Sequence, residues 1–229
     1  MKYENIVEAE FISRPNRFIA IVRLNGEEIK AHVPNTGRCK ELLIPGVKVI
    51  LSRSDNPNRK LSYSLISVYK GDMLVNIDSQ NPNRLVYEAL ATGKLFGKIP
   101  DRIKKEYTFG SSRIDLMFED AVLGKGLIEV KGCTLEIDGH TFFPDAPTER
   151  GVKHLKELIE AKKDGWNCYV VFAIQMKGVR AFSPNRNTHG EFADVLADAD
   201  KAGVKILAFD SIVSPDEVVL DSEVGVILI

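Results

Sequence analysis

The sequence has few cysteines, and none of the spacings that form a disulfide framework or a zinc site. It contains Cys39, Cys133 and Cys168, which lie far apart, and no CxxC pair occurs. An odd, dispersed set of thiols argues against both kinds of site. We therefore expect ordinary thiols in the core or near the surface.

Long apolar runs are also lacking. No stretch reaches the roughly 20 apolar residues that a membrane-spanning helix needs. The first ten residues, MKYENIVEAE, carry acidic side chains where a secretion signal needs an apolar segment. These features predict a cytoplasmic protein without membrane association. The apolar content of 44% and the length of 229 residues suit one large globular domain or two small ones.

Several catalytic motifs are absent. The sequence has no GxxxxGK[ST] phosphate loop, no GxGxxG, no GxSxG and no HExxH. Its four histidines are widely separated. These absences disfavour a nucleotide-binding protein, a serine hydrolase and a zinc hydrolase.

Net charge is close to zero, at −1, so the overall charge gives no support for nucleic-acid binding. The distribution of charge is uneven. Residues 1–110 carry 18 Lys and Arg against 12 Asp and Glu, and residues 111–229 carry 13 against 20. This pattern suits a first part that contacts phosphates and a second part that holds metal. An uneven but merely solvated surface is the alternative.

Residues 1–80 have the pattern of a small β domain. The predicted strands are residues 6–12, 18–24, 29–33, 47–51, 61–69 and 73–77, with turns at 13–16 and 25–26 and a short helix at 39–43. This order predicts an OB-like β-barrel that binds nucleic acid. The candidate contacts are Arg14, Arg17, Asn35, Thr36 and Arg38. Alternatively, Asn35 and Gly37 only form a turn and Arg38 is solvated.

Residues 81–229 alternate helices with strands, which predicts an α/β domain with a mixed central sheet. The predicted helices are 81–93, 148–165 and a third helix that begins with a capping box at 188–191 and ends at Gly203. The predicted strands are 166–176 and 204–209, and a loop is predicted at 183–187. The apolar tail, residues 218–229, has two interpretations. It pairs across a homodimer, or it closes the sheet of its own chain.

The strongest chemical signal lies in residues 113–131, RIDLMFEDAVLGKGLIEVK. Period-two alternation predicts two strands joined by a turn, with Asp115 on one and Glu129 and Lys131 together on one face of the next. If the strands pair as a hairpin and those faces coincide, the three side chains converge. Two carboxylates bind a hard divalent cation, Mg²⁺ or Mn²⁺. The metal would neutralise a phosphate and activate a water, which Lys131 would orient.

Other residues are candidates for the same site. Thr148 and Arg150 begin a helix whose N-terminus attracts anions, and Arg113 leads into the first strand of the hairpin. Glu88, on the preceding helix, either joins the carboxylates or is solvated.

Two residues near that helix start have more than one interpretation. His154 shares a helix face with Arg150, and we expect an exposed or half-buried histidine rather than a general base. Asp145 is either a site carboxylate or a turn residue.

Longer segments carry a more specific resemblance. They are RPNRF at 14–18, HVPNTGR at 32–38, GSSRIDLMF at 110–118, IEVKGCTL at 128–135, FPDAPTERGVKHLKEL at 143–158 and FSPN at 182–185. Together they resemble the sugar fermentation stimulation protein A family over nearly the whole chain. That resemblance implies an N-terminal OB-like domain, a C-terminal PD-(D/E)XK nuclease-like domain and DNA binding. Ile114 stands where the short nuclease motif has proline.

Two functional hypotheses follow. The first is a Mg²⁺-dependent nuclease that cuts single- or double-stranded DNA, with Asp115, Glu129, Lys131 and Glu88 in its site. The second is a DNA-binding regulator linked to sugar metabolism, on a nuclease-like scaffold without turnover.

Overall fold

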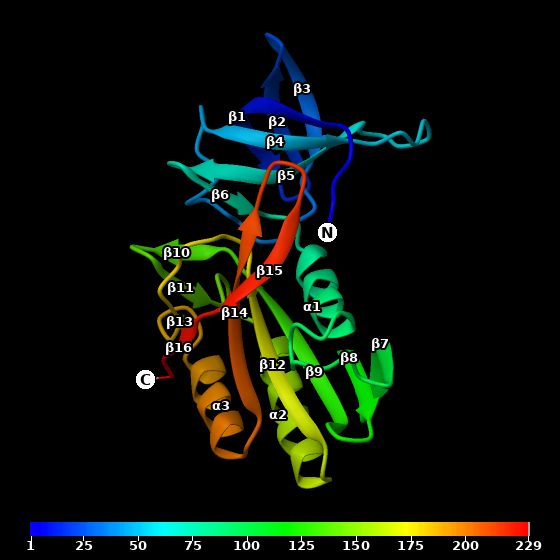
Figure 1. Ribbon diagram of the computed structural model, residues 1–229. Helices are drawn as coiled ribbons and strands as arrows, with labels where there is room; N and C mark the ends of the chain where they lie inside the picture. The colour runs from blue at the N-terminus through cyan, green and yellow to red at the C-terminus, as the bar shows by residue number, and fades with distance from the viewer. Residues whose placement is uncertain (229) are drawn as a thin grey trace.

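The computed structural model describes residues 1–228 and places a β-barrel at one end of the molecule and a larger sheet with three helices at the other (Figure 1). The barrel strands are β1 (Ile6–Asn16), β2 (Ile19–Leu24), β3 (Glu27–His32), β4 (Lys48–Arg53), β5 (Tyr63–Lys70) and β6 (Met73–Asn76). They pair in the order β3-β2-β1-β4-β5-β6, and a parallel contact between β3 and β5 closes the barrel. The predicted OB-like barrel is confirmed.

The β2–β3 hairpin forms as its sequence predicts. Asn25 and Gly26 both have positive φ, at 51° and 87°, which a two-residue turn of this kind requires. The alternating residues Ala20, Val22 and Ala31 are fully buried inside the barrel.

Two local predictions in the barrel are wrong. The expected turn at 13–16 belongs to β1, which continues to Asn16, so Phe18 lies in the turn and is 53% exposed. The expected helix at 39–43 is a single turn, in which the Leu43 N–H donates to the Cys39 carbonyl. Pro45 follows at once, and the Gly46 N–H donates to the Phe11 carbonyl, so the chain returns to β1 before a helix can propagate.

The second sheet has six strands in the order β15-β14-β12-β9-β8-β7. Its elements are α1 (Asn81–Ala91), β7 (Arg102–Phe109), β8 (Ser112–Asp120), β9 (Gly124–Cys133), α2 (Glu149–Lys163), β12 (Asn167–Ile174), α3 (Gly190–Lys201), β14 (Lys205–Val213) and β15 (Val218–Glu223). β7, β8 and β9 are antiparallel, whereas β12 is parallel to both β9 and β14. The expected mixed sheet is therefore confirmed.

Helices cover both faces of this sheet. Leu116, Ile128 and Val130 pack with the apolar side of α1, whereas Met117 and Leu127 pack with α2 and α3. On β9, where successive side chains point to opposite faces, this division places Leu127 and Glu129 on the α2 side and Ile128 and Val130 on the α1 side. Within residues 1–228, no helix has the length and apolarity to cross a membrane.

A small third sheet was not predicted. It consists of β10 (Leu135–Ile137), β11 (His140–Phe143), β13 (Ala181–Pro184) and β16 (Gly225–Val226). β13 replaces the start of the loop predicted at 183–187. In the described part of the tail, β15 pairs with β14 and β16 pairs with β13, so the tail closes sheets of its own chain. Ile229 lies outside the described residues.

The three helices predicted in residues 81–229 form, with one difference at a helix start. Thr148 caps α2 by accepting the Gly151 N–H, as its sequence predicts. The predicted capping box at 188–191 does not form, because His189 is the N-cap of α3 and makes no capping hydrogen bond. Its Nδ1 instead accepts the Thr148 N–H, which ties the start of α3 to that of α2. All three cysteines are free and buried, as predicted.

Candidate active site

The hairpin of β8 and β9 brings the predicted carboxylates together. Leu116 pairs with Ile128 at the end of the β8–β9 ladder, so Asp115 and Glu129 are the next residues on the two strands. Asp115 is half-buried and held at both oxygens. Its Oδ2 accepts the Val130 N–H at 2.8 Å, and its Oδ1 accepts the Asn83 amide at 2.7 Å. Asn83, in the first turn of α1, was not predicted to belong to the site.

Glu129 is only 2% exposed, yet its two oxygens have different surroundings. Oε1 accepts hydrogen bonds from Lys131 Nζ, at 2.5 Å, and from His154 Nδ1. Oε2 is buried and has no partner within residues 1–228. A buried carboxylate oxygen without a partner carries a large desolvation penalty. This oxygen therefore fits a cation ligand, and the acidic donor set fits a hard divalent metal.

His154 reaches this carboxylate from α2. The side chain is buried, so the expectation of an exposed or half-buried histidine is wrong. Arg150 Nε lies 3.3 Å from His154 Nε2. Because a guanidinium only donates, Nε2 has to accept, and the proton sits on Nδ1 and points to Glu129. The four-residue spacing of Arg150 and His154 was the only sequence signal for this chain of bonds.

The two carboxylates have opposite pKa shifts. Burial raises the pKa of Asp115 above its ordinary value, and the charge of Glu129 raises it further. Burial would also raise the pKa of Glu129, but the hydrogen bond from His154 and the charge of Lys131 outweigh it. The pKa of Glu129 is therefore lowered. Glu129 stays ionised while Asp115 takes a proton more readily, a pattern found where two carboxyl groups have different roles.

Glu88 is not brought to this group. Its Oε2 lies 2.9 Å from the N-terminal amine of Met1, and its Oε1 accepts Arg84 Nε at 3.0 Å. The apolar stripe of α1 faces the sheet and leaves Glu88 at the edge, where these two cations compensate its charge. The interpretation of Glu88 as a third site carboxylate is therefore corrected.

Basic side chains line a groove beside the site. Arg113 and Arg150 line this groove together with His154, and it also contains Lys153 and the acidic Glu149. Thr148 lies at the same helix start, but its hydroxyl caps α2.

The barrel candidates fall into two groups. Arg14 donates to four backbone carbonyls, each at 2.7 Å, so its guanidinium holds a loop rather than facing solvent. Asn35 is likewise engaged: Oδ1 accepts the Gly37 N–H and Nδ2 donates to the Ile77 carbonyl. These two residues shape the 35–38 loop, which corrects their expected role as phosphate contacts.

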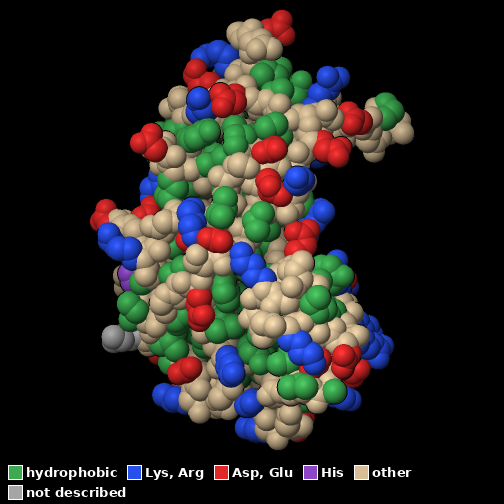
Figure 2. Space-filling model, in the orientation of Figure 1, with side chains coloured by type: hydrophobic (Ala, Val, Ile, Leu, Met, Phe, Trp, Pro, Cys, Tyr) green, Lys and Arg blue, Asp and Glu red, His purple; other side chains and the backbone are tan. Residues whose placement is uncertain are grey.

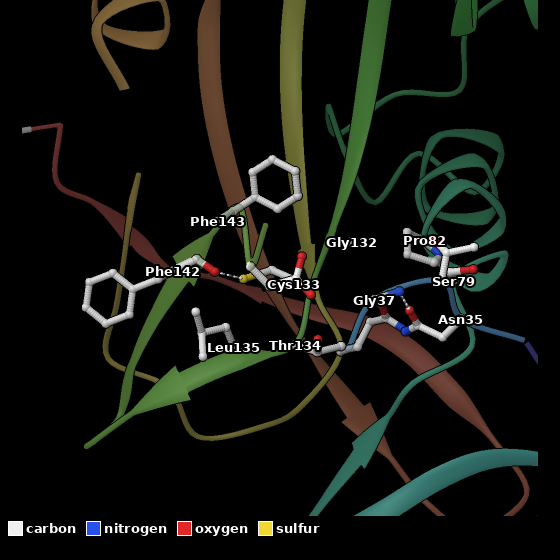
Figure 3. Close-up of a pocket in the computed structure, with 13 residues that line it drawn as sticks. Asn35, Gly37, Ser79, Pro82, Gly132, Cys133, Thr134, Leu135, Phe142 and Phe143 are labelled. Carbon is white, nitrogen blue, oxygen red and sulfur yellow. Dashed lines mark hydrogen bonds between the residues drawn. The ribbon is translucent and has the colours of Figure 1, made fainter. Parts of the chain in front are cut away.

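The other barrel candidates remain available to a ligand. Arg17 and Arg38 are exposed and share a groove with Lys40, and no acidic residue lines it. Thr36 is exposed on the loop that faces the end of β9 (Figure 3).

A second group with metal-ligand spacing lies at the starts of α2 and α3. Glu149, His189 and Glu191 each offer an atom within 4.8 Å of the others. Lys156 already pairs with Glu191 at 2.9 Å, and His189 Nδ1 accepts a backbone N–H. Both glutamates are exposed. These partners fit an ion-pair cluster better than a closed metal site.

The fold and this geometry define a class: an OB barrel followed by a nuclease-like α/β domain. Models of two protein families match the same two parts. "SfsA N-terminal OB domain" matches residues 12–77, and "Sugar fermentation stimulation protein RE domain" matches residues 80–217. The chain belongs to the sugar fermentation stimulation protein family, SfsA, which confirms the resemblance found in the sequence.

Relatives and a solved structure agree along the full length. The chain is 50% identical to the sugar fermentation stimulation protein homolog of Alkaliphilus oremlandii, covering 99% of this chain and 98% of the relative. The chain is 54% identical to the homolog of Desulfitobacterium hafniense, and the match covers 95% of this chain and 94% of that relative. The structure of Pyrococcus furiosus SfsA in complex with Ca²⁺ superposes with a TM-score of 0.86 at 28% identity, over 99% of this chain and 97% of that one.

Proposed function

We propose that this protein hydrolyses phosphodiester bonds in DNA, using Mg²⁺ or Mn²⁺ held by Asp115 and Glu129. The observation that carries the proposal is the buried, unpartnered Oε2 of Glu129, opposite Asp115. The Ca²⁺ complex of the Pyrococcus relative supports a hard cation with oxygen ligands.

Each side chain then has a distinct task. A bound divalent ion supplies positive charge for the phosphate and lowers the pKa of a water. Lys131 uses one donor on Glu129 and keeps two for the attacking water and a phosphate oxygen. His154 and Asn83 hold the two carboxylates in place. Arg113 and Lys153 bind the phosphate backbone of the DNA beside the site.

The barrel supplies a second contact to the nucleic acid. Arg17, Arg38 and Lys40 line its groove, which suits a phosphate backbone. Figure 2 shows that Lys and Arg alternate with Asp and Glu over the visible face. Binding of the nucleic acid would therefore depend on local basic grooves rather than on a surface that is positively charged throughout.

A non-catalytic DNA-binding regulator linked to sugar metabolism is the second candidate. The name of the family favours it. The basic groove of the barrel favours it too, because its arginines and lysine do not depend on the hairpin carboxylates.

The test is incubation of the purified protein with labelled single- and double-stranded DNA and RNA, in Mg²⁺, Mn²⁺ or EDTA. We expect metal-dependent cleavage of DNA that Glu129→Ala and Lys131→Ala abolish while binding persists. Glu160→Ala, on the exposed side of α2, is the matched control. Binding without cleavage of any substrate would establish the regulator instead. Cleavage by Lys131→Ala at the wild-type rate would refute the assigned site.

A further inference from the structure

A cavity of about 170 Å³ lies between the 35–37 loop of the barrel and the end of β9 (Figure 3). Thr36, Ser79 and Asp145 are exposed at its mouth, and Gly132 and Gln175 line its wall. An engineered protein cavity of about 150 Å³ holds benzene. The volume therefore suits one six-membered ring.

The cavity adjoins the candidate active site through the backbone. Gly132 directly follows Lys131 on β9, and Pro82, on another wall, directly precedes Asn83. Asn83 is the residue that holds Asp115. Consecutive Cα atoms lie about 3.8 Å apart. Binding at both places requires a strand whose phosphate lies at Asp115 and Glu129 to turn a neighbouring base toward the cavity.

Gln175 presents a fixed hydrogen-bond acceptor to the cavity. The side chain is 2% exposed, and its Nε2 donates to Asn76 Oδ1 at 2.9 Å and to the Asp78 carbonyl at 3.0 Å. Because the Asp78 carbonyl can only accept a hydrogen bond, the Gln175 atom that faces it must be Nε2, which fixes the position of Oε1. Oε1 receives no hydrogen bond within residues 1–228. A Cβ on Gly132 would lie 2.9 Å from it, so only glycine leaves this oxygen accessible.

Asp145 presents a second acceptor from the other side. Its carboxylate has no hydrogen-bond partner within the described chain, and a Cβ on Gly37 would lie 2.8 Å from Oδ2. Burial raises the pKa values of Cys133 and Cys39 to about 12, and the charge of Asp145 contributes to both shifts. These thiols belong to the sheet and to the barrel, so the carboxylate lies between the two.

The lining of the cavity selects the chemistry of its ligand. Two acceptors without a partner in the described chain face it, one of them the exposed carboxylate of Asp145, and no Lys or Arg lines it. A phosphate would be repelled. A ligand that donates N–H groups would satisfy both acceptors.

We propose that this cavity binds one unpaired cytosine or adenine, whose N4 or N6 amino group donates to Gln175 Oε1 and Asp145. The inference rests on the proposed function, because it makes single-stranded or frayed nucleic acid the preferred substrate. The amino group of cytosine donates to carboxylates in protein–DNA complexes. Uracil and thymine present O4 at that place, which leaves the buried acceptor of Gln175 unpaired.

The test is fluorescence anisotropy of short labelled oligo-dC, oligo-dU and oligo-dT, with Ca²⁺ replacing Mg²⁺. Cytosine and uracil differ mainly at position 4, so this pair isolates the amino group. We expect oligo-dC to bind roughly tenfold more tightly than oligo-dU or oligo-dT. Asp145→Asn, which adds a donor, should remove most of that preference. Gly37→Ala, which crowds Asp145, should weaken oligo-dC binding most.

The control is Asp164→Asn, an exposed aspartate at the end of α2, which should keep the wild-type preference. Equal affinity of the wild type for the three oligonucleotides would overturn the base pocket while leaving DNA binding intact. No affinity for any of them would overturn both. An unchanged preference in Asp145→Asn would also overturn the assignment, whatever the cleavage assay shows.

Discussion

At the scale of single residues, Asp115 and Glu129 make opposite contributions to stability. The folded pKa of Asp115 is raised, so the native state binds a proton more readily than the unfolded chain, and its contribution to stability falls as pH rises through that pKa. The folded pKa of Glu129 is lowered. Its stabilising contribution is present above the ordinary carboxyl pKa and is lost as pH falls through the folded value.

Neutral amides at these positions should therefore have opposite effects in the absence of metal. We expect Asp115→Asn to raise the free energy of unfolding at pH 7 by roughly 0.5–1 kcal/mol, because it removes a buried charge beside Glu129. Glu129→Gln should lower it by roughly 3 kcal/mol, because Lys131 loses its buried partner. Urea unfolding in EDTA at decreasing pH measures both, and both differences should shrink toward acid pH. Effects of the same sign would contradict the pKa directions.

His154 should act on the metal rather than on the substrate. Its Nδ1–H orients Glu129 so that Oε2 stays free, and such supporting hydrogen bonds typically contribute 10- to 100-fold to metal affinity. We expect His154→Ala to weaken Mn²⁺ binding, measured by calorimetry, by about that factor. His154→Asn retains a donor near Nδ1 and should recover part of the affinity. Unchanged Mn²⁺ affinity in His154→Ala would remove this role.

At the scale of elements, Arg14 holds the 35–38 loop against the barrel. Its guanidinium binds four carbonyls in a fixed fork, which the single ammonium of lysine cannot reproduce. We expect Arg14→Lys to lower the free energy of unfolding by roughly 2 kcal/mol and to speed amide hydrogen exchange in residues 35–38. Arg17→Lys, an exposed neighbour, should change neither quantity. Normal protection of the loop in Arg14→Lys would show that other contacts suffice.

The elements also show which parts of the fold a sequence can predict. Alternation over residues 113–131 predicted the hairpin that carries Asp115, Glu129 and Lys131, because strand periodicity is local. The N-cap of α2 at Thr148 was also predicted, because capping depends only on residues close to one another in the sequence. β11 and β13 were missed, since they are four residues each and pair in parallel across a long sequence separation. The burial of His154 depends on how α2 packs on β9, and no local pattern contains that information.

At the scale of the whole molecule, a buried polar network joins the barrel to the larger sheet. Asn76 lies at the end of β6. Its side-chain oxygen accepts hydrogen bonds from Gln175, which directly follows β12, and from Asn81 of α1, both at 2.9 Å. Its own amide donates to Ile66 and Ser67 of β5. One side chain thus fixes how the 35–37 loop faces β9, and with it the shape of the cavity between them.

Asn76→Ala should therefore impair the candidate site without touching its carboxylates. The substitution removes the acceptor of the buried Asn81 amide and one of the two acceptors of the Gln175 amide, at a cost of about 1–3 kcal/mol. We expect a lower free energy of unfolding, separate calorimetric transitions for the barrel and the larger sheet, and slower DNA cleavage. Asn187→Ala, at an exposed asparagine, is the matched control. A single transition with unchanged cleavage would mean that apolar packing alone aligns the two parts, because the network would then be dispensable for both stability and catalysis.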